Sequence, residues 1–358
     1  MKLVTIIGAR PQFVKASVVS KALREAGHTE ILVNTGQHYD DNMAKIFFEE
    51  MAIPRPDYDL GVGSGTHAQQ TAASMIGIEE ILIKEHPDFL IVYGDTNATV
   101  AGALAAAKLH IKIVHIEAGL RSYNRQMPEE INRIVTDVIS DYLMVPTQVA
   151  ADNLKREGID QGVHIVGDVM VDALRTYTLV AEQKSIILNQ LKLEKDDFIL
   201  MTIHRPSNAD SNERLSEILR SVSGVGLPVV FPVHPRSKAR VEALMGDVDG
   251  DIRLIEPVGY LDMMLLEKYS RMIITDSGGV QKEAYLHKTP CLTVRSETEW
   301  VETVIDGWNH LVGDNLDLIQ ELSRNFPTPK RWSNHYGDGN SSSQIVTLLA
   351  QSHSGQKD

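Results

Sequence analysis

The sequence has only one cysteine, Cys291, in 358 residues. A single cysteine excludes an internal disulfide framework and any metal site built from several thiolates, and it is typical of the reducing cytoplasm. A long hydrophobic run is also missing. The N-terminus, "MKLVTIIGARPQ", is too short in apolar residues for a signal-peptide core, and no later stretch reaches the length of a membrane span. We therefore expect a cytoplasmic protein with no membrane partner.

Basic residues are fewer than acidic ones, with 35 lysines and arginines against 48 aspartates and glutamates, and the net charge is -13. This balance argues against a surface for nucleic acid or anionic membrane, because both need a broad basic patch. It does not argue against a small anionic ligand, which needs only a few local cations.

Two cofactor signatures are missing as well. The first strand-to-helix turn, "GARPQFVK" (8–15), is not the glycine fingerprint of dinucleotide-binding domains. The histidines of "TIHRPS" and "PVHPR" do not have the spacing of a zinc motif. We therefore expect neither a dinucleotide cofactor nor a metal ion.

Short runs of Val, Ile and Leu alternate with longer amphipathic segments, which is typical of parallel sheets with crossover helices. The chain length suits two domains. The predicted strands are 3–8, 30–36, 89–94, 113–117, 142–147, 198–204, 228–234, 252–257, 271–279 and 290–295. The predicted first-half helices are 11–26, 67–85, 97–109 and 128–141.

The fold class that follows is α/β, with two Rossmann-like doubly wound domains facing each other across a cleft. We expect an N-terminal domain over 1–167, a C-terminal domain over 168–340, and a last helix over 341–358 that packs back on the N-terminal domain. Ligands bind at the carboxyl ends of strands in such sheets. The residues with suggestive chemistry at those ends are Arg10, Gln37, Asp95, Glu117, His204, His234 and Asp276.

The segment "TDSGGVQKEA" (275–284) follows a predicted strand and precedes a helix. Gly278 and Gly279 let the backbone approach a ligand, the helix N-terminus favours a phosphate, and Ser277 adds a hydroxyl. Glu283 lies far enough along the helix to reach ribose hydroxyls. An ordinary helix N-cap with a tight turn is the alternative.

Other candidates are individually weaker. Arg10 and Lys15 lie near another helix N-terminus and suit a diphosphate. On its own, Asp95 of "YGDTNAT" is better explained as a helix N-cap. The two strand-end histidines, His204 and His234, suggest a site because they end equivalent strands.

The stretch "HIEAGLRSYNRQMPEEINR" (115–133) concentrates charge between a strand and a helix. Pro128 suits a first helical position, Glu129 and Glu130 favour the positive helix end, and Glu129 can pair with Arg133. These helix rules do not account for Glu117. The residues that we expect on the buried face of this helix are Ile131, Ile134, Val135, Val138 and Ile139.

Taken together, the motifs resemble the non-hydrolysing UDP-N-acetylglucosamine 2-epimerase family. The matching stretches, in the family's order, are "TIIGARPQFVK", "NTGQHYD", "VYGDTNATV", "HIEAGLRS", "MPEEINR", "PVHPR", "TDSGGVQKEA" and "YGDGNSSSQI". The resemblance implies the two-domain fold of the GT-B glycosyltransferases, a UDP-sugar substrate, no cofactor, and a homodimer. It also implies inversion at C2 of a UDP-N-acetylhexosamine, by elimination of UDP to a glycal and re-addition.

The resemblance carries roles to particular residues. Asp95, Glu117 and Glu129 match the family's acidic catalytic positions, and His204 matches its catalytic histidine. UDP and substrate binding is implied for a larger set, which comprises Arg10, Lys15, His234, Arg236, Ser277, Gly278, Gly279 and Glu283. Which carboxylate acts on which face of C2 stays open.

The sequence departs from the family at several places. "HRPS" replaces "HRRE", "QHYDDNM" replaces "QHREM", "RPQF" has Gln12 for a glutamate, and "TEWVE" has Trp300 for an arginine. These departures argue against the second, regulatory UDP-GlcNAc site of bacterial members. They also resemble a branch that epimerises UDP-2,3-diacetamido-2,3-dideoxyglucuronate for surface polysaccharides, where Arg205, His234 or Arg236 would meet the substrate carboxylate.

Two further functions stay open on the sequence. A GT-B glycosyltransferase shares the nucleotide site but has no need of acid/base groups around C2, whereas Asp95, Glu117 and Glu129 are present. A non-catalytic nucleotide-sugar sensor is expected to keep the "DSGG" turn and to lose those three carboxylates.

Overall fold

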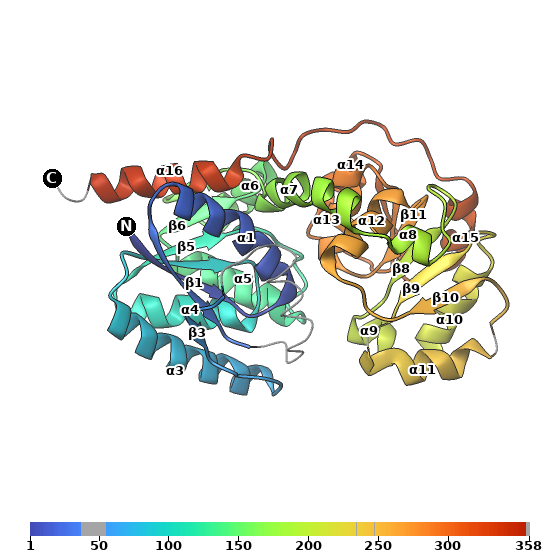
Figure 1. Cartoon of the computed structure of the whole chain (residues 1–358), viewed down its shortest axis with the longest axis horizontal. Helices are drawn as coiled ribbons and strands as arrows, with labels where there is room; N and C mark the ends of the chain where they lie inside the picture. Colours follow the sequence, from blue (N-terminus) through green and yellow to red (C-terminus); the bar gives the residue numbers. More distant parts are fainter. Residues whose placement is uncertain (37–54, 234, 247, 356–358) are drawn as a thin grey trace. The chain divides into compact units, whose positions relative to one another are not determined.

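The computed structural model describes residues 1–36, 55–233, 235–246 and 248–355, without the side chains of Arg10, Pro235 and Arg236. Contacts divide the chain into two compact units (Figure 1). Unit 1 consists of Met1–Thr176 and Asn334–Asp358, and unit 2 of Tyr177–Ser333. Each unit has its own parallel sheet with interleaved helices, so the predicted fold class is confirmed as α/β with two doubly wound sheets. No helix in the described ranges is both long and apolar enough to cross a membrane.

The sheet of unit 1 has seven strands in the order β3-β2-β1-β4-β5-β6-β7. Its central strands are almost wholly buried and mostly apolar, as expected for a parallel sheet covered on both faces. In chain order the strands are β1 (Lys2–Ile7), β2 (Thr29–Asn34), β3 (Tyr58–Asp59), β4 (Phe89–Tyr93), β5 (Lys112–Ile116), β6 (Tyr142–Val145) and β7 (Val163–Ile165).

Helices cover both faces of this sheet. In Figure 1, α1 and α16 lie on the opposite side of the sheet from α3 and α4. Small residues let α4 pack closely, since a Cβ at Gly102 would lie 3.2 Å from the Ile6 side chain. The helices of unit 1 are α1 (Arg10–Glu25), α3 (His67–Glu85), α4 (Asn97–Lys108), α5 (Pro128–Ile139), α6 (Gln148–Arg156), the first turns of α7 (Val169–Lys184) and α16 (Ser341–Ser354).

The sheet of unit 2 has six strands in the order β10-β9-β8-β11-β12-β13. They are β8 (Ile199–Thr202), β9 (Val229–Pro232), β10 (Ile252–Ile255), β11 (Met272–Thr275), β12 (Cys291–Thr293) and β13 (Asn309–Leu311). The helices beyond α7 are α8 (Ile187–Gln190), α9 (Pro206–Ala209), α10 (Asn212–Ser223), α11 (Pro235–Met245), α12 (Tyr260–Tyr269), α13 (Gly278–His287), α14 (Val301–Ile305) and α15 (Asp317–Arg324).

The division between the units falls inside α7, nine residues after the boundary expected at Gly167. Buried polar contacts explain why the start of α7 belongs to unit 1. The carboxylate of Asp172 accepts hydrogen bonds from the backbone N–H groups of Ser341 (3.1 Å) and Ser342 (2.8 Å). Helix α16 therefore starts on α7, and it continues along α1.

Helix α5 is oriented differently from our prediction. Its buried residues are polar, namely Glu130, Asn132, Arg133, Thr136 and Asp137. The expected apolar inner face is wrong for Ile131 and Val138, which are 38% and 64% exposed. Ile134, Val135 and Ile139 are half-buried. The helix faces inward with its polar side because that side binds the polar loops after β4 and β5.

Candidate functional site

Each sheet reverses its strand order once, and ligands of open α/β sheets bind at the carboxyl ends of the strands where this happens. In unit 1 the reversal lies between β1 and β4, and in unit 2 between β8 and β11. The predicted residues at these ends are Lys15 and Asp95 in unit 1, and His204 and Ser277 in unit 2. The strand order and the sequence therefore indicate the same strand ends as candidate ligand-binding positions.

Asp95 and Glu117 follow neighbouring strands. Strands β4 and β5 pair in register up to Tyr93 and Ile116, and the N–H of Gly94 donates to the carbonyl of Ile116 at 2.9 Å. Asp95 comes directly after Gly94, and Glu117 directly after Ile116. Two residues with carboxylate side chains thus follow neighbouring strand ends at one edge of the sheet.

The backbone of Glu117 is in the left-handed region, with φ 71°. A non-glycine residue there costs about 1–3 kcal/mol and persists only where its surroundings hold it. The N–H groups of Glu117 and Ala118 both donate to the carbonyl of Met144, at 3.0 and 3.3 Å. Such strain is concentrated at functional sites.

Lys15, expected to bind a diphosphate, contacts a catalytic candidate. Its ammonium nitrogen Nζ lies 2.6 Å from Oε1 of Glu117, and both side chains are 9% exposed. Helix α1 brings Lys15 there because it starts directly after β1, beside β4. The pair holds one positive and one negative charge at the sheet edge.

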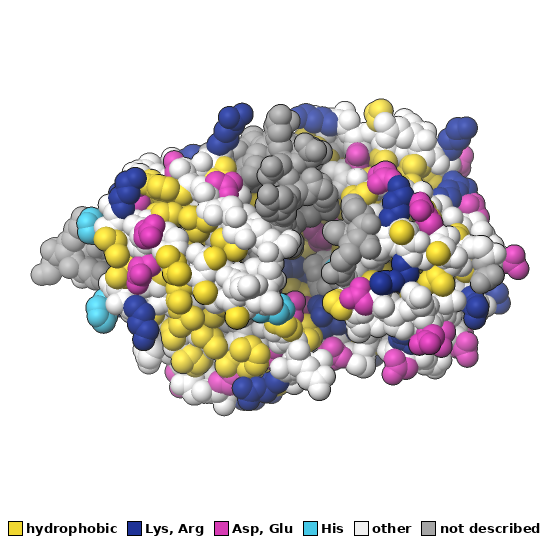
Figure 2. All heavy atoms as spheres, turned by 90° about the horizontal axis from the view of Figure 1, so that it is seen from below, with side chains coloured by type: hydrophobic (Ala, Val, Ile, Leu, Met, Phe, Trp, Pro, Cys, Tyr) yellow, Lys and Arg dark blue, Asp and Glu magenta, His cyan; other side chains and the backbone are white. Residues whose placement is uncertain are grey.

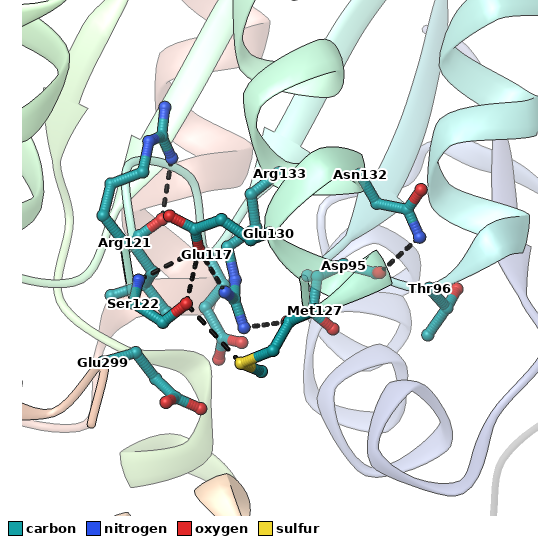
Figure 3. A network of polar contacts seen from close by, with 12 residues as sticks. Asp95, Thr96, Glu117, Arg121, Ser122, Met127, Glu130, Asn132, Arg133 and Glu299 are labelled. Carbon is teal, nitrogen blue, oxygen red and sulfur yellow. Dashed lines mark hydrogen bonds and ion pairs between the residues drawn. The ribbon is translucent and has the colours of Figure 1, made fainter. Parts of the chain in front are cut away.

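Arg133 of α5 joins two carboxylates (Figure 3). Its Nη2 donates to Oδ2 of Asp95 at 2.5 Å, and its Nη1 donates to Oε2 of Glu130 at 2.7 Å. Glu130 also accepts hydrogen bonds from the N–H groups of Ser122 and Tyr123, both at 2.9 Å. Burial raises the pKa of Glu130, but the Ser122 N–H and Arg133 outweigh it and hold the pKa below its usual value.

A second buried network involves His115, at 0% exposure. Its Nδ1 lies 2.7 Å from Oδ1 of Asp137, and its Nε2 lies 2.8 Å from the carbonyl oxygen of Gly94. Both ring nitrogens are therefore engaged by buried polar partners. Burial raises the pKa of Asp137, but His115 and Arg121 lower it below its usual value.

Glu129 is the second residue of α5 and is half-buried. Arg133 contacts Asp95 and Glu130, the residue next to Glu129. The expected pairing of Glu129 with Arg133 stays a prediction.

In unit 2 the carboxylate of Asp276, directly after β11, binds the backbone and side chains of the segment after β8. It is fully buried and accepts hydrogen bonds from the N–H groups of His204 (3.1 Å) and Arg205 (3.0 Å) and from the Asn208 amide (3.1 Å). Burial raises the pKa of Asp276, but the hydrogen bond from His204 and its other donors bring it below the usual value. The His204 ring lies 3.1 Å from Asp276 and its side chain is 53% exposed, so it is available to a ligand.

The predicted anion site lies at the start of α13. The Ser277 hydroxyl caps this helix by accepting from the N–H of Val280. Gly278 is packed, since a Cβ there would lie 2.2 Å from Oε1 of Glu299. Gly279 is exposed, and a Cβ there would meet only the Ser277 hydroxyl, at 3.9 Å. The open side of this helix N-terminus is therefore at Gly279.

The remaining predicted residues lie in less defined surroundings. Glu283 is half-buried in α13. Arg10 starts α1 and Arg236 lies in α11, but their side chains are outside the description. His234 and Gln37 are outside the described residues.

The sequence analysis did not identify Arg133 and Asp137 as members of the buried networks, and it did not predict that Glu130 is buried. A signal was present, because 130, 133 and 137 are spaced as one face of a helix. We assigned the inner face to the apolar residues of α5 instead, and this assignment hid the polar stripe.

Comparisons with known proteins add an independent line of evidence. A family model described as UDP-N-acetylglucosamine 2-epimerase matches residues 21–350. The chain is 51% identical to a UDP-N-acetylglucosamine 2-epimerase homolog of Methanococcus maripaludis, over 98% of this chain and 99% of the relative. It is 49% identical to the UDP-2,3-diacetamido-2,3-dideoxy-D-glucuronate 2-epimerase of Pseudomonas aeruginosa, over 98% of this chain and 100% of the relative.

A solved structure is also similar over the whole chain. The crystal structure of Methanocaldococcus jannaschii UDP-GlcNAc 2-epimerase, in complex with UDP-GlcNAc and UDP, matches with a TM-score of 0.91 and 44% identity. The match covers 98% of this chain and 100% of that one. Sequence and fold thus point to the same group of enzymes.

Proposed function

The chain belongs to the UDP-N-acetylglucosamine 2-epimerase family, and we propose that it inverts C2 of a UDP-N-acetylhexosamine. The C2 proton of such a sugar is not acidified by a carbonyl group, so simple deprotonation is unfavourable. Elimination avoids this problem: a base takes the C2 proton as the C1–O bond to UDP breaks, leaving a glycal. UDP then adds back to C1 while an acid returns a proton to the opposite face of C2.

The acid and base groups come from unit 1. We assign proton transfer at C2 to Asp95, Glu117 and Glu129, with His204 of unit 2 as a further proton carrier. The observation that carries this assignment is the position of Asp95 and Glu117 at the ends of the paired strands β4 and β5. Acid/base groups of this kind contribute about 10²–10⁴-fold to rate.

UDP binding is assigned mainly to unit 2. The N-terminus of α13, with the Ser277 hydroxyl and the open backbone at Gly279, suits a phosphate because its N–H groups and helix dipole favour negative charge. Gly278 and Glu283 complete this segment. The cations that we assign to the diphosphate and substrate are Lys15, Arg10, His234 and Arg236.

A second substrate is favoured by one relative. The Pseudomonas aeruginosa enzyme that acts on the diacetamido-glucuronate is nearly as similar as the first relative named above, and similar over the whole chain. The ammonium nitrogen of Lys282 in α13 lies 4.2 Å from the centroid of the Trp300 ring. Trp300 is one of the positions at which the sequence departs from the family. The alternative function is the same C2 inversion on UDP-2,3-diacetamido-2,3-dideoxyglucuronate, as a step towards surface polysaccharide.

One experiment tests both versions. The purified protein is incubated in deuterium oxide with each UDP-sugar separately, and C2 is followed by proton NMR. Deuterium at C2 together with the epimeric product identifies the substrate. Neither exchange nor epimerisation with either sugar would contradict the proposed activity on these substrates.

We further propose that the chain forms a homodimer through the apolar layer of α3 and α5. Figure 2 shows hydrophobic side chains gathered over one face of unit 1. The exposed large hydrophobic residues of these helices, which flank α4, are Ile76 and Ile83 on α3 and Ile131 and Val138 on α5. Each pair is seven residues apart and so lies on one side of its helix. An exposed apolar face of this kind is typical of a protein interface.

A further inference from the structure

The structure leads us to propose that Arg133 is a positioning residue for Asp95, the carboxylate that it holds by one oxygen. The guanidinium side chain is 4% exposed, and its Nη2 lies 2.5 Å from Oδ2 of Asp95 (Figure 3). The inference rests on the proposed epimerase function, because it assigns Arg133 a task only if Asp95 transfers a proton.

Asp95 needs an external support because its side chain is 29% exposed. A partly exposed carboxylate rotates about its own bonds, whereas proton transfer needs a fixed geometry, held within about 0.5 Å. A guanidinium is planar and presents its donors in a fixed fork, so it fixes the direction of the oxygen that it binds. Its contact uses Oδ2. We assign the other oxygen, Oδ1, to the substrate.

Arg133 is itself held in place. Its Nη1 donates to Glu130, whose side chain is 1% exposed and which in turn accepts hydrogen bonds from the N–H and hydroxyl of Ser122 and the N–H of Tyr123. A chain of charge-assisted hydrogen bonds thus runs from the backbone of the loop after β5 to Asp95. Such a chain positions a side chain more firmly than a single contact does.

The backbone of the Asp95 turn has separate supports. The amide of Asn132 donates to the carbonyl oxygen of Asp95 at 2.9 Å, and Nε2 of His115 donates to the carbonyl oxygen of Gly94 at 2.8 Å. Neither contact involves Arg133. Removal of the guanidinium is therefore expected to free the Asp95 side chain and to leave the turn in place.

The test uses Arg133→Ala, in which small guanidinium ions can enter the vacated space. We expect kcat to fall roughly 100-fold, the cost of a small displacement of a reacting group. KM for the UDP-sugar should stay unchanged, because the Arg133 side chain is buried and we assign it no contact with the substrate. Guanidinium chloride at millimolar concentration should restore part of kcat. Sodium chloride at equal ionic strength should not. Arg24→Ala, at an exposed arginine of α1, is the matched control and should show neither loss nor rescue.

A double variant covers the case in which Arg133→Ala does not fold. Arg133→Ala leaves Glu130 as a buried charge, and Glu130→Gln in the same chain removes that charge. The inference is overturned if the folded single or double variant keeps the wild-type kcat, or if sodium chloride restores activity as well as guanidinium. A wild-type protein without C2 exchange would instead contradict the proposed function.

Discussion

Lys15 and Glu117 form a hydrogen-bonded ion pair, with 2.6 Å between Nζ and Oε1 and only 9% of either side chain exposed. We expected separate tasks for them, diphosphate binding for Lys15 and proton transfer for Glu117. On the proposed roles the contact would couple the two tasks, because an ammonium that turns towards a departing diphosphate releases the carboxylate at the same moment. It also means that a change at either residue leaves a poorly solvated charge behind.

Glu117→Gln should therefore lower stability as well as activity. Breaking a buried ion pair from one side costs about 3–5 kcal/mol, although the remaining exposure of this pair favours the lower end. Lys15→Met together with Glu117→Gln removes both charges and should recover part of the stability but no activity. Urea denaturation of the two single variants and the double variant measures the coupling. Additive losses would show that the contact does not stabilise the fold.

Asp95→Asn should suppress C2 exchange by about 10²–10⁴-fold, the usual contribution of a positioned acid or base. UDP should still bind, because we assign none of its contacts to Asp95. Deuterium incorporation followed by NMR measures the loss of C2 exchange, and calorimetric titration measures UDP binding. Asp160→Asn, at an exposed aspartate, is the control. Equal loss of UDP affinity and of folding would instead make Asp95 structural.

Most of the sheet framework could be predicted from the sequence. Every predicted strand is present. Parallel strands that are buried on both faces are continuous apolar runs, so each one can be identified from its own sequence. Strand ends then follow, and with them Asp95, Glu117, His204 and Asp276. The strands that we did not predict, β3, β7 and β13, have two or three residues and are at or near sheet edges, where too few residues are buried to give a pattern.

Helix α5 shows where sequence reasoning stopped. Periodicity indicates that a helix has two faces but not which face turns inward, and the general preference for apolar burial gave the wrong answer for Val138. The inner face is decided by contacts over long sequence distances, such as Arg133 with Asp95. Polar loops after β4 and β5 need charged partners, and this requirement is not visible within the helix itself.

The outward face of α5 leads to a prediction about assembly. Val138→Glu places a charge in the proposed α3 and α5 interface and should shift the protein from dimer to monomer in sedimentation or light-scattering measurements, because a desolvated unpaired charge is unfavourable. Leu179→Glu is a matched control, since Leu179 is also 64% exposed but belongs to α7 in unit 2. A dimer that survives Val138→Glu at all concentrations would rule out this interface.

The buried side chain of His287 should make the free energy of unfolding depend on pH. Burial and, to a lesser extent, the charge of Lys268 lower the pKa of His287 to about 4, against about 6.5 in an unfolded chain. Between these values the unfolded chain binds a proton that the folded protein does not. The free energy of unfolding should therefore fall as the pH drops from about 6.5 towards 4, by up to about 3 kcal/mol.

His287→Phe removes the titrating group, and its Nε2 has no hydrogen-bond partner in the described part of the chain that would be lost. Urea midpoints measured across this pH range should then depend less on pH than those of the wild type. An unchanged pH dependence would show that carboxylates such as Asp276 and Asp137, whose lowered pKa values also cost stability in acid, account for the whole effect.

Gly278 and Gly279 separate a structural role from a binding role at the start of α13. Gly278→Ala places a Cβ 2.2 Å from Oε1 of Glu299. The buried Glu299 carboxylate must then shift from its contact with Arg295, at 3.0 Å, so stability should fall even without ligand. Gly279→Ala meets nothing closer than 3.9 Å and should change stability by less than about 1 kcal/mol. If the diphosphate lies against this helix, the added methyl group occupies its space, and UDP affinity should fall in a folded, stable variant. Thermal unfolding and calorimetric titration with UDP distinguish the cases, and full UDP affinity in Gly279→Ala would move the phosphate site away from the open side of α13.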